Sequence, residues 1–246
     1  MSYLFAPPPP PTLPILDSDQ VFPIRRVFCV GRNYAAHAAE MGNEVDREAP
    51  FYFLKSAHHV LFADGSDVPV PPRTTNYHHE IELVAALDKG GRGIAVGDAL
   101  DHVLGYAVGL DMTRRDLQQD SKDKRRSWDT SKDFEFSGLC SALCPPGKGA
   151  RPDQGAITLH VNGALQQRGD LADQVWSLAE IIADLSTLYR LEPGDVIFTG
   201  TPSGVGPVVA GDTMVGAIEG IGTLNVRLRL PPPVRKNAVE MIARSD

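Results

Sequence analysis

The stretches HHEIELVAAL at residues 78–87 and LGYAVGLD at residues 104–111 decide the fold class. Each is an apolar run whose length and composition predict a β-strand. Successive side chains of a strand point to opposite faces, so Glu80 and Glu82 share one face and the apolar residues beside them take the other. The first stretch is therefore predicted to be a strand that carries two carboxylates side by side on a half-buried face.

A pair of carboxylates in such a position is unfavourable unless something compensates for their charge. Glu80 and Glu82 repel each other, and partial removal from water raises the penalty. A divalent cation bound between them would reverse it. Asp111, at the end of the second stretch, supplies a third oxygen ligand, and three carboxylates without a nearby cysteine favour Mg²⁺ or Mn²⁺. The alternative is a solvated strand face whose E-x-E pair is matched by Lys or Arg.

Short strands broken by Gly and Pro dominate the sequence from residue 51 to about residue 230. One long helix interrupts them at 171–191, where apolar residues recur at helical spacing. The class is therefore a β-rich α+β fold. Further strands are predicted at 27–31, 51–56, 68–72, 156–163, 195–202 and 223–230, and the apolar stripe of the helix consists of Val175, Leu178, Ile181, Ile182 and Leu185.

The ends of the chain differ from the rest. Five prolines at 7–11 predict an extended polyproline arm outside the core, and we assign residues 1–24 to this arm. The main domain is expected over 25–232, and the tail at 233–246 is expected to be a frayed helix or disordered.

Bulk properties exclude several classes of function. The 246 residues, 42% hydrophobic and 22% charged, are those of an ordinary soluble protein with a substantial core. A net charge of -7 argues against a nucleic-acid partner. No apolar run approaches the length of a membrane span, and the stretch MSYLFAPPPPPTLP lacks the basic and apolar regions expected of a signal peptide. The odd number of cysteines (Cys29, Cys140 and Cys144) favours the cytoplasm, with all three as buried thiols.

A possible base and a possible cation lie elsewhere in the sequence. His37 and Glu40 are three residues apart on a predicted Ala-rich helix at 32–41, a spacing that lets the carboxylate orient the imidazole to deprotonate a water. A surface pair is the alternative. Lys132 stands between Trp128 and Phe134, so its ammonium is expected to be partly enclosed and able to neutralise an oxyanion, whereas a solvated lysine is the alternative.

Two further segments offer groups for an anionic ligand. The run DMTRRDLQ at 111–118 contains Arg114, Arg115 and Gln118. The Gly-rich turn TGTPSGVG at 199–206 lets backbone N–H groups approach a ligand, but it is not a P-loop because no G-K-[ST] follows.

The order of these motifs is more informative than any one of them. The succession VGRNYAAHAAEMG, FLK, HHEIEL, GYAVGLDMTRRDLQ, SKDF, VNG and LEPGDVIFTGTPSGVGP resembles the fumarylacetoacetate hydrolase family from about Val27 to Leu230. Within the family the chain is most similar to the bacterial branch of fumarylpyruvate hydrolases and acylpyruvases. The resemblance implies a mixed β-roll of packed sheets and a homodimer.

The resemblance also implies roles for individual residues. Glu80, Glu82 and Asp111 match the ligands of Mg²⁺ or Mn²⁺. His37 and Glu40 match the pair that activates water on a lid helix, which the stretch at 42–50 would let close. Lys132 matches the lysine of the active site, and Arg115, Gln118 and Thr201 match residues that face the substrate.

The implied reaction is hydrolysis of the C–C bond of a β-diketo acid, with fumarylpyruvate, from a gentisate-type aromatic catabolic route, as the expected substrate. Acylpyruvate hydrolysis, oxaloacetate decarboxylation and 2-oxo acid isomerisation use related chemistry and stay open, as does a non-catalytic keto-acid binder. Fumarylpyruvate also carries a second, distal carboxylate. The candidates to bind it are Arg32, Arg114, Arg125 and Arg126.

Overall fold

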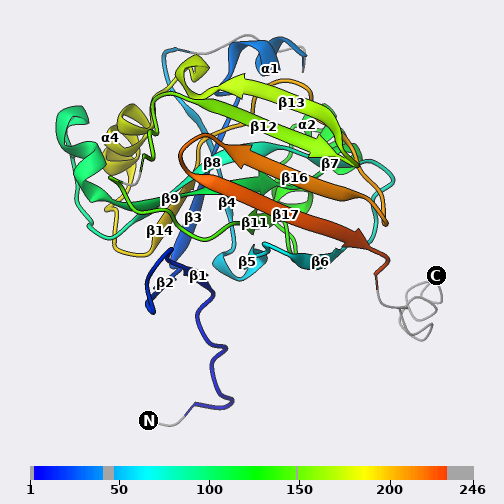
Figure 1. Cartoon of the computed structure of the whole chain (residues 1–246), viewed down its shortest axis with the longest axis horizontal. Coiled ribbons are helices and arrows are strands. Elements are labelled where there is room, and N and C mark those ends of the chain that lie inside the picture. The colour runs from blue at the N-terminus through cyan, green and yellow to red at the C-terminus, as the bar shows by residue number, and fades with distance from the viewer. Residues whose placement is uncertain (1–2, 41–46, 148, 232–246) are drawn as a thin grey trace.

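The computed structural model describes residues 3–40, 47–147 and 149–231. The predicted tail at 233–246 and the first half of the stretch at 42–50 lie outside the described residues. Figure 1 shows two layers of strands with helices at their margins, which confirms the strand-rich class and the mixed, curled sheet.

The central element is a seven-stranded mixed sheet that curls on itself. The strand order is β4-β3-β14-β8-β9-β11-β5. Its strands are β4 (Phe51–Lys55), β3 (Arg26–Gly31), β14 (Asp195–Phe198), β8 (Ile81–Leu87), β9 (Val103–Asp111), β11 (Gly138–Cys140) and β5 (Val60–Phe62).

Chain connectivity forces this curl. The two edge strands, β4 and β5, are joined only by residues 56–59, which include the 3₁₀ turn Ala57–His59. Such a link spans at most about 18 Å. Six strand spacings in a flat sheet would place the edges about 29 Å apart. The sheet therefore has to bend until its edges approach each other, and the bend encloses one of its faces.

A second, five-stranded sheet covers the other face. Its order is β13-β12-β16-β17-β6, and β12 contacts β8 while β16 and β17 contact β9. The strands are β13 (Ala164–Asp170), β12 (Ala156–Val161), β16 (Thr213–Ile218), β17 (Gly222–Arg229) and β6 (Ser66–Pro69). Every residue of β8 is buried as a result. The expectation of a half-buried strand is therefore wrong, because both faces of β8 lie in hydrophobic cores.

The helices are short and lie around the sheets: α1 (Ala35–Glu40), α2 (Arg115–Asp123), α3 (Asp129–Lys132) and α4 (Leu178–Leu188), with 3₁₀ turns at Val96–His102 and Leu171–Asp173. Small sheets are formed by β10 (Thr113–Arg114), β7 (Tyr77–His79) and β15 (Gly206–Pro207), and by β1 (Thr12–Pro14) and β2 (Val21–Pro23). No helix in the described ranges is long and apolar enough to cross a membrane.

Helix α4 begins later than the predicted 171–191. Ser177 and Glu180 form a capping box: the Glu180 N–H donates to Ser177 Oγ at 3.3 Å, and the Ser177 N–H donates to Glu180 Oε2 at 2.8 Å. Val175 therefore precedes the helix, whereas the other four residues of the predicted stripe are buried. The three cysteines are buried, as expected.

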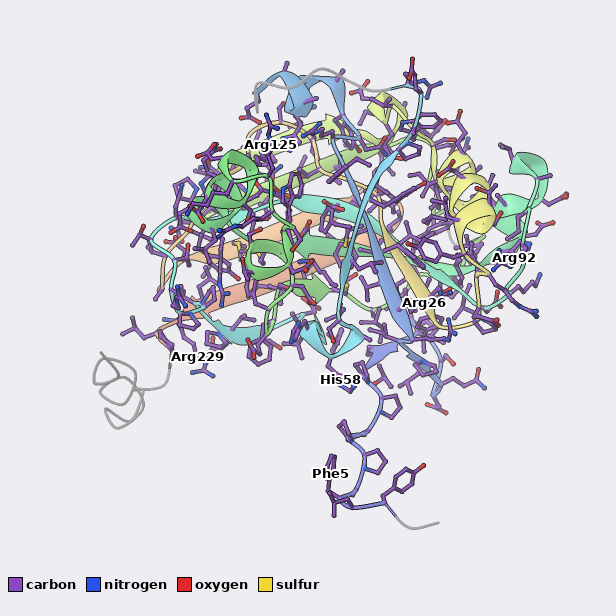
Figure 2. The ribbon with its side chains drawn as sticks, turned by 180° about the vertical axis from the view of Figure 1, so that it is seen from behind. Phe5, Arg26, His58, Arg92, Arg125 and Arg229 are labelled. Carbon is purple, nitrogen blue, oxygen red and sulfur yellow. The ribbon has the colours of Figure 1, made fainter. Side chains whose placement is uncertain are left out.

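The segment 1–24 divides into an exposed part and a packed part. Residues 3–10 are exposed, and Figure 2 shows Phe5 well away from the body of the protein. Leu13, Phe22 and Ile24 are buried in the hydrophobic core that the curled seven-stranded sheet encloses. The Leu143 N–H also donates to the Pro14 carbonyl at 2.8 Å. Residues 12–24 thus pack against the main domain although the sequence assigned them to the arm, whereas the described residues 3–10 are exposed.

This division predicts different effects of two changes. The substitution Leu13→Ala should lower the free energy of unfolding by about 2–5 kcal/mol, because it leaves a cavity under the sheet. Deletion of residues 1–10 should change it by less than about 0.5 kcal/mol, since the described part of this segment, residues 3–10, is exposed. Urea unfolding monitored by circular dichroism measures both. Equal losses would show that the arm contributes to stability as the packed part does.

Candidate metal centre and active site

Three carboxylates meet inside the curl of the seven-stranded sheet. Strands β8 and β9 are antiparallel with Ile81 opposite Leu110, and the Asp111 N–H donates to the Glu80 carbonyl at 2.8 Å. This register places Asp111 beside Glu80 and Glu82. Each offers a carboxylate oxygen, and these atoms all lie within 4.8 Å of one another. The side chains are deeply buried, with exposed fractions of 4% for Glu80, 2% for Glu82 and 0% for Asp111.

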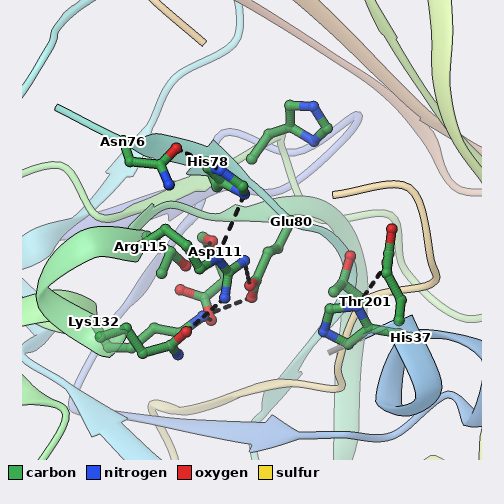
Figure 3. A network of polar contacts seen from close by, with 12 residues as sticks. His37, Asn76, His78, Glu80, Asp111, Arg115, Lys132 and Thr201 are labelled. Carbon is green, nitrogen blue, oxygen red and sulfur yellow. Dashed lines mark hydrogen bonds and ion pairs between the residues drawn. The ribbon is translucent and has the colours of Figure 1, made fainter. Parts of the chain in front are cut away.

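Buried cations surround two of the three carboxylates (Figure 3). The Lys132 ammonium donates to Glu80 Oε2 at 2.6 Å and to Asp111 Oδ2 at 2.8 Å. Lys55 Nζ lies 2.8 Å from Asp111 Oδ1, and Arg115 forms an ion pair with Glu80. Burial alone would lower the pKa of Lys132, but the adjacent anions Asp111 and Glu80 raise it, so this lysine stays charged.

Glu82 is in a different electrostatic environment. No cation of the described structure pairs with it, and its Oε2 accepts only the Gly200 N–H at 2.8 Å. Burial, together with the negative charges of Asp111 and Glu80, holds the pKa of Glu82 well above its usual range. Burial opposes ionisation of Glu80 too, but Lys132 and Arg115 bring the pKa of Glu80 below its usual range. One carboxylate of the three therefore lacks a compensating charge.

This donor set fits a hard divalent cation. It consists of oxygen atoms only, its members converge, and the uncompensated carboxylate would gain most from a positive charge. The turn after β14 keeps Glu82 in place. Gly200 has φ +98°, and a Cβ there would lie 2.7 Å from Asn33 Cβ, so the turn requires glycine at this position.

His37 and Glu40 lie on α1 at the same pocket. His37 is 7% exposed, and its Nδ1 is 3.4 Å from Glu40 Oε2, while Glu40 also accepts the Gly204 N–H at 3.1 Å. Burial lowers the pKa of His37 below its ordinary value, against the opposing effect of the Glu80 and Glu40 carboxylates. The imidazole is therefore neutral at pH 7, the form that accepts a proton.

The predicted ligand-facing residues are also held by specific contacts. Arg115 Nη1 donates to Gln118 Oε1 at 2.6 Å, and Thr201 Oγ1 accepts from Gln167 Nε2 at 2.9 Å. Of the catalytic, metal-binding and substrate-facing residues that the sequence predicted, all except Glu40 line one pocket, and Glu40 contacts it through His37. The remaining lining residues are Val30, Gly31, Arg32, Phe53, Lys122 and Trp128.

Two buried polar residues were not anticipated from the sequence. Lys55 ends β4 and contacts Asp111; a lysine that closes the apolar run FYFLK was a signal that could have identified it. Gln167 is fully buried and joins Thr201 to His79, whose Nδ1 is 2.9 Å from Gln167 Oε1. It stands in the polar run QQR, where nothing in the local sequence distinguishes it from a surface residue.

Comparison with known proteins agrees with this geometry. Residues 26–229 match the family described as fumarylacetoacetate hydrolase C-terminal. The chain is 50% identical to a fumarylpyruvate hydrolase of Ralstonia over 76% of its own length and 97% of that protein. It is 40% identical to the mitochondrial oxaloacetate tautomerase of Bos taurus over 84% of its length and 93% of that protein.

A solved structure of a fumarylpyruvate hydrolase is also similar to this chain over nearly its whole length. The fumarylpyruvate hydrolase of Pseudomonas aeruginosa, determined with Mn²⁺ and pyruvate, superimposes with a TM-score of 0.90 at 51% identity. The match covers 94% of this chain and all of the other.

Glu80 has cationic partners and Glu82 has none in the described structure. Replacing each by neutral glutamine should therefore shift the melting temperature of the protein in EDTA in opposite directions. Glu82→Gln should raise the melting temperature of the metal-free protein because it removes repulsion. Glu80→Gln should lower it, since it leaves the buried Arg115 without its carboxylate and Lys132 with Asp111 alone, a loss of about 3–5 kcal/mol. Differential scanning calorimetry measures both.

Excess MnCl₂ extends the same experiment. It should raise the melting temperature of the wild type by about 5 °C or more. Neither variant should respond to the metal. A full Mn²⁺ response in Glu82→Gln would remove Glu82 from the proposed ligands.

Proposed function

The chain belongs to the fumarylacetoacetate hydrolase family, and on this premise we propose that it hydrolyses fumarylpyruvate to fumarate and pyruvate. The observation that carries the proposal is the convergence of three buried carboxylates, a buried lysine and a neutral histidine on one pocket. The two fumarylpyruvate hydrolases described above, each at least half identical to this chain, support the choice of substrate.

Glu80, Glu82 and Asp111 are the proposed ligands of Mg²⁺ or Mn²⁺. When bound, such a cation acts as a Lewis acid on the oxygen atoms of a 2-oxo acid and stabilises negative charge that develops there. The bound Mn²⁺ and pyruvate of the Pseudomonas aeruginosa enzyme support this assignment.

His37 is the proposed general base. Its Nδ1 faces Glu40, which leaves Nε2 to take a proton from water. The oxygen of that water adds to the C4 carbonyl of fumarylpyruvate. The C3–C4 bond then breaks, C4 leaves in fumarate, and the electron pair of the bond passes to the pyruvate enolate. Protonation of C3 completes pyruvate, so one water is consumed for each bond broken.

Lys132, Arg115, Gln118 and Thr201 are proposed to bind and orient the substrate. The Lys132 ammonium lies between Glu80 and Asp111, where it offsets charge on the enolate oxygen and is a source of a proton. Arg115 and Gln118 are held together, and Thr201 is fixed by Gln167, so each enters the reaction already positioned.

We also propose a cytoplasmic homodimer that serves aromatic catabolism, with one catalytic domain over 25–232 against which residues 12–24 pack. The bacterial source of two relatives supports the compartment, and their name supports fumarylpyruvate, the substrate expected in such a pathway. Exposed apolar residues on the edge strand β4, Phe51 and Leu54, are suitable for a subunit contact.

Oxaloacetate tautomerisation is the second candidate activity. It too requires a base beside a polarised 2-oxo acid, and the 40% identical Bos taurus relative carries that name. It differs from hydrolysis in that no water is added and no C–C bond breaks.

A direct assay separates the two activities. We expect rapid loss of the fumarylpyruvate absorbance with Mn²⁺ or Mg²⁺, slower loss of acetylpyruvate, and no loss in EDTA. His37→Asn should bind Mn²⁺ as the wild type does but lose about a hundredfold or more in kcat. Turnover of oxaloacetate alone would favour the second activity, and full activity of His37→Asn would remove its role as base.

The depressed pKa of His37 predicts the pH dependence. A base must be unprotonated, so the acidic limb of kcat/KM should fall below pH 6.5, the ordinary pKa of histidine. Glu40 raises the pKa of His37, so Glu40→Gln should move this limb to still lower pH and reduce the maximal rate. A limb that stays in place in Glu40→Gln would mean that another group is the base.

A further inference from the structure

Two basic side chains at the entrance of the pocket have no acidic partner among the residues that the structure describes. Arg32 and Lys122 line both the active-site pocket and the groove outside it, so they lie at the boundary between the two. Both are half-buried. Within the described part of the chain, no carboxylate lies within ion-pair distance of either. Their charges are therefore available to a ligand.

The fold positions Arg32 at an energetic cost. Arg32 follows β3 directly and has φ +61°, a conformation that is uncommon for a residue other than glycine. The next residue enforces it. Asn33 Nδ2 donates to the Thr199 carbonyl at 2.7 Å and to the Trp176 carbonyl at 2.9 Å, and Asn33 Oδ1 accepts the Trp176 N–H at 2.7 Å. The guanidinium of Arg32 lies 5.5 Å from the centre of the Phe51 ring.

Lys122 approaches the same place from α2. Its ammonium lies 5.3 Å from the centre of the Trp128 ring. Burial lowers the pKa of Lys122, and the positive charges of Arg115 and Arg32 lower it further. Two cations are thus held near each other beside aromatic rings, an arrangement that an anionic ligand would stabilise.

The other arginines suggested by the sequence are less suitable. Arg114 lies 4.2 Å from the centre of the Phe134 ring, donates to the Thr130 carbonyl at 3.1 Å and does not line the pocket. Arg125 and Arg126 are exposed and line only the outer groove.

We propose that Lys122 and Arg32 bind the distal carboxylate of the substrate and so select a dicarboxylic β-diketo acid over a methyl-terminated one. This inference rests on the proposed function. Trp128 and Phe53 line both the pocket and the groove outside it. At this position their rings would contact a flat conjugated chain such as the fumaryl group.

The test compares fumarylpyruvate with acetylpyruvate, which has a methyl group in place of the fumaryl chain. In Lys122→Met the ratio of kcat/KM for fumarylpyruvate to that for acetylpyruvate should fall by about tenfold or more, mainly through KM. Methionine keeps an apolar contact with Trp128. Lys122→Arg should restore most of the ratio. Arg32→Gln should act in the same direction.

Lys124→Met is the matched control. Lys124 lies two residues further along, is exposed and pairs with Asp120, so this variant should keep the wild-type ratio. An unchanged ratio in both Lys122→Met and Arg32→Gln would overturn the proposal. An equal loss with both substrates would also overturn it, because it would indicate a role in the reaction common to them.

Binding separates this inference from the proposed function. Calorimetric titration of the Mn²⁺-loaded protein should show that Lys122→Met weakens fumarylpyruvate binding more than acetylpyruvate binding, whether or not either is hydrolysed. A wild type that hydrolyses neither substrate would refute the proposed function alone. Equal weakening of both ligands would refute selection of the distal carboxylate.

Discussion

Burial of three carboxylates inside a curled sheet is the constraint on which the rest of the structure depends. Charges removed from water have to be compensated nearby. Three carboxylates (Glu80, Glu82 and Asp111) and three cations (Lys55, Lys132 and Arg115) sum to zero formal charge when all are ionised, although the cations pair with Glu80 and Asp111 and not with Glu82 in the described structure. A divalent cation then adds two positive charges. The carboxylate and enolate of a 2-oxo acid supply two negative ones, so the proposed ligand restores the balance.

The curl itself is what brings these groups together. The short link between β4 and β5 bends the sheet and brings Lys55, at the end of an edge strand, against Asp111 near the centre. Helix α3 delivers Lys132 to the same point. An open sheet of the same strands would leave these lysines in solvent, where their ion pairs would contribute little. The topology thus determines the electrostatics of the site.

The sequence was informative where chemistry depends on local spacing. The two-residue period of a strand predicted that Glu80 and Glu82 share a face, and the order of motifs identified the family. The sequence was uninformative where the burial of a residue depends on segments that are distant along the chain. Nothing local separates Gln167 from its polar neighbours, because its burial arises from contacts with Thr201 and Pro202. The packing of Leu13 next to five prolines likewise depends on strands from much later in the chain.

The placement of β14 has a consequence for how the protein folds. This strand pairs in parallel with β3 and antiparallel with β8, and the Arg26–Asp195 ion pair joins residues 169 positions apart. During synthesis, β3 and β8 lack β14, the strand that pairs with both of them, until most of the chain has left the ribosome. Closing so long a loop carries a large entropic penalty, so folding should be slow. Until β14 pairs with them, the unpaired edges of β3 and β8 are the places where a nascent chain is exposed to aggregation.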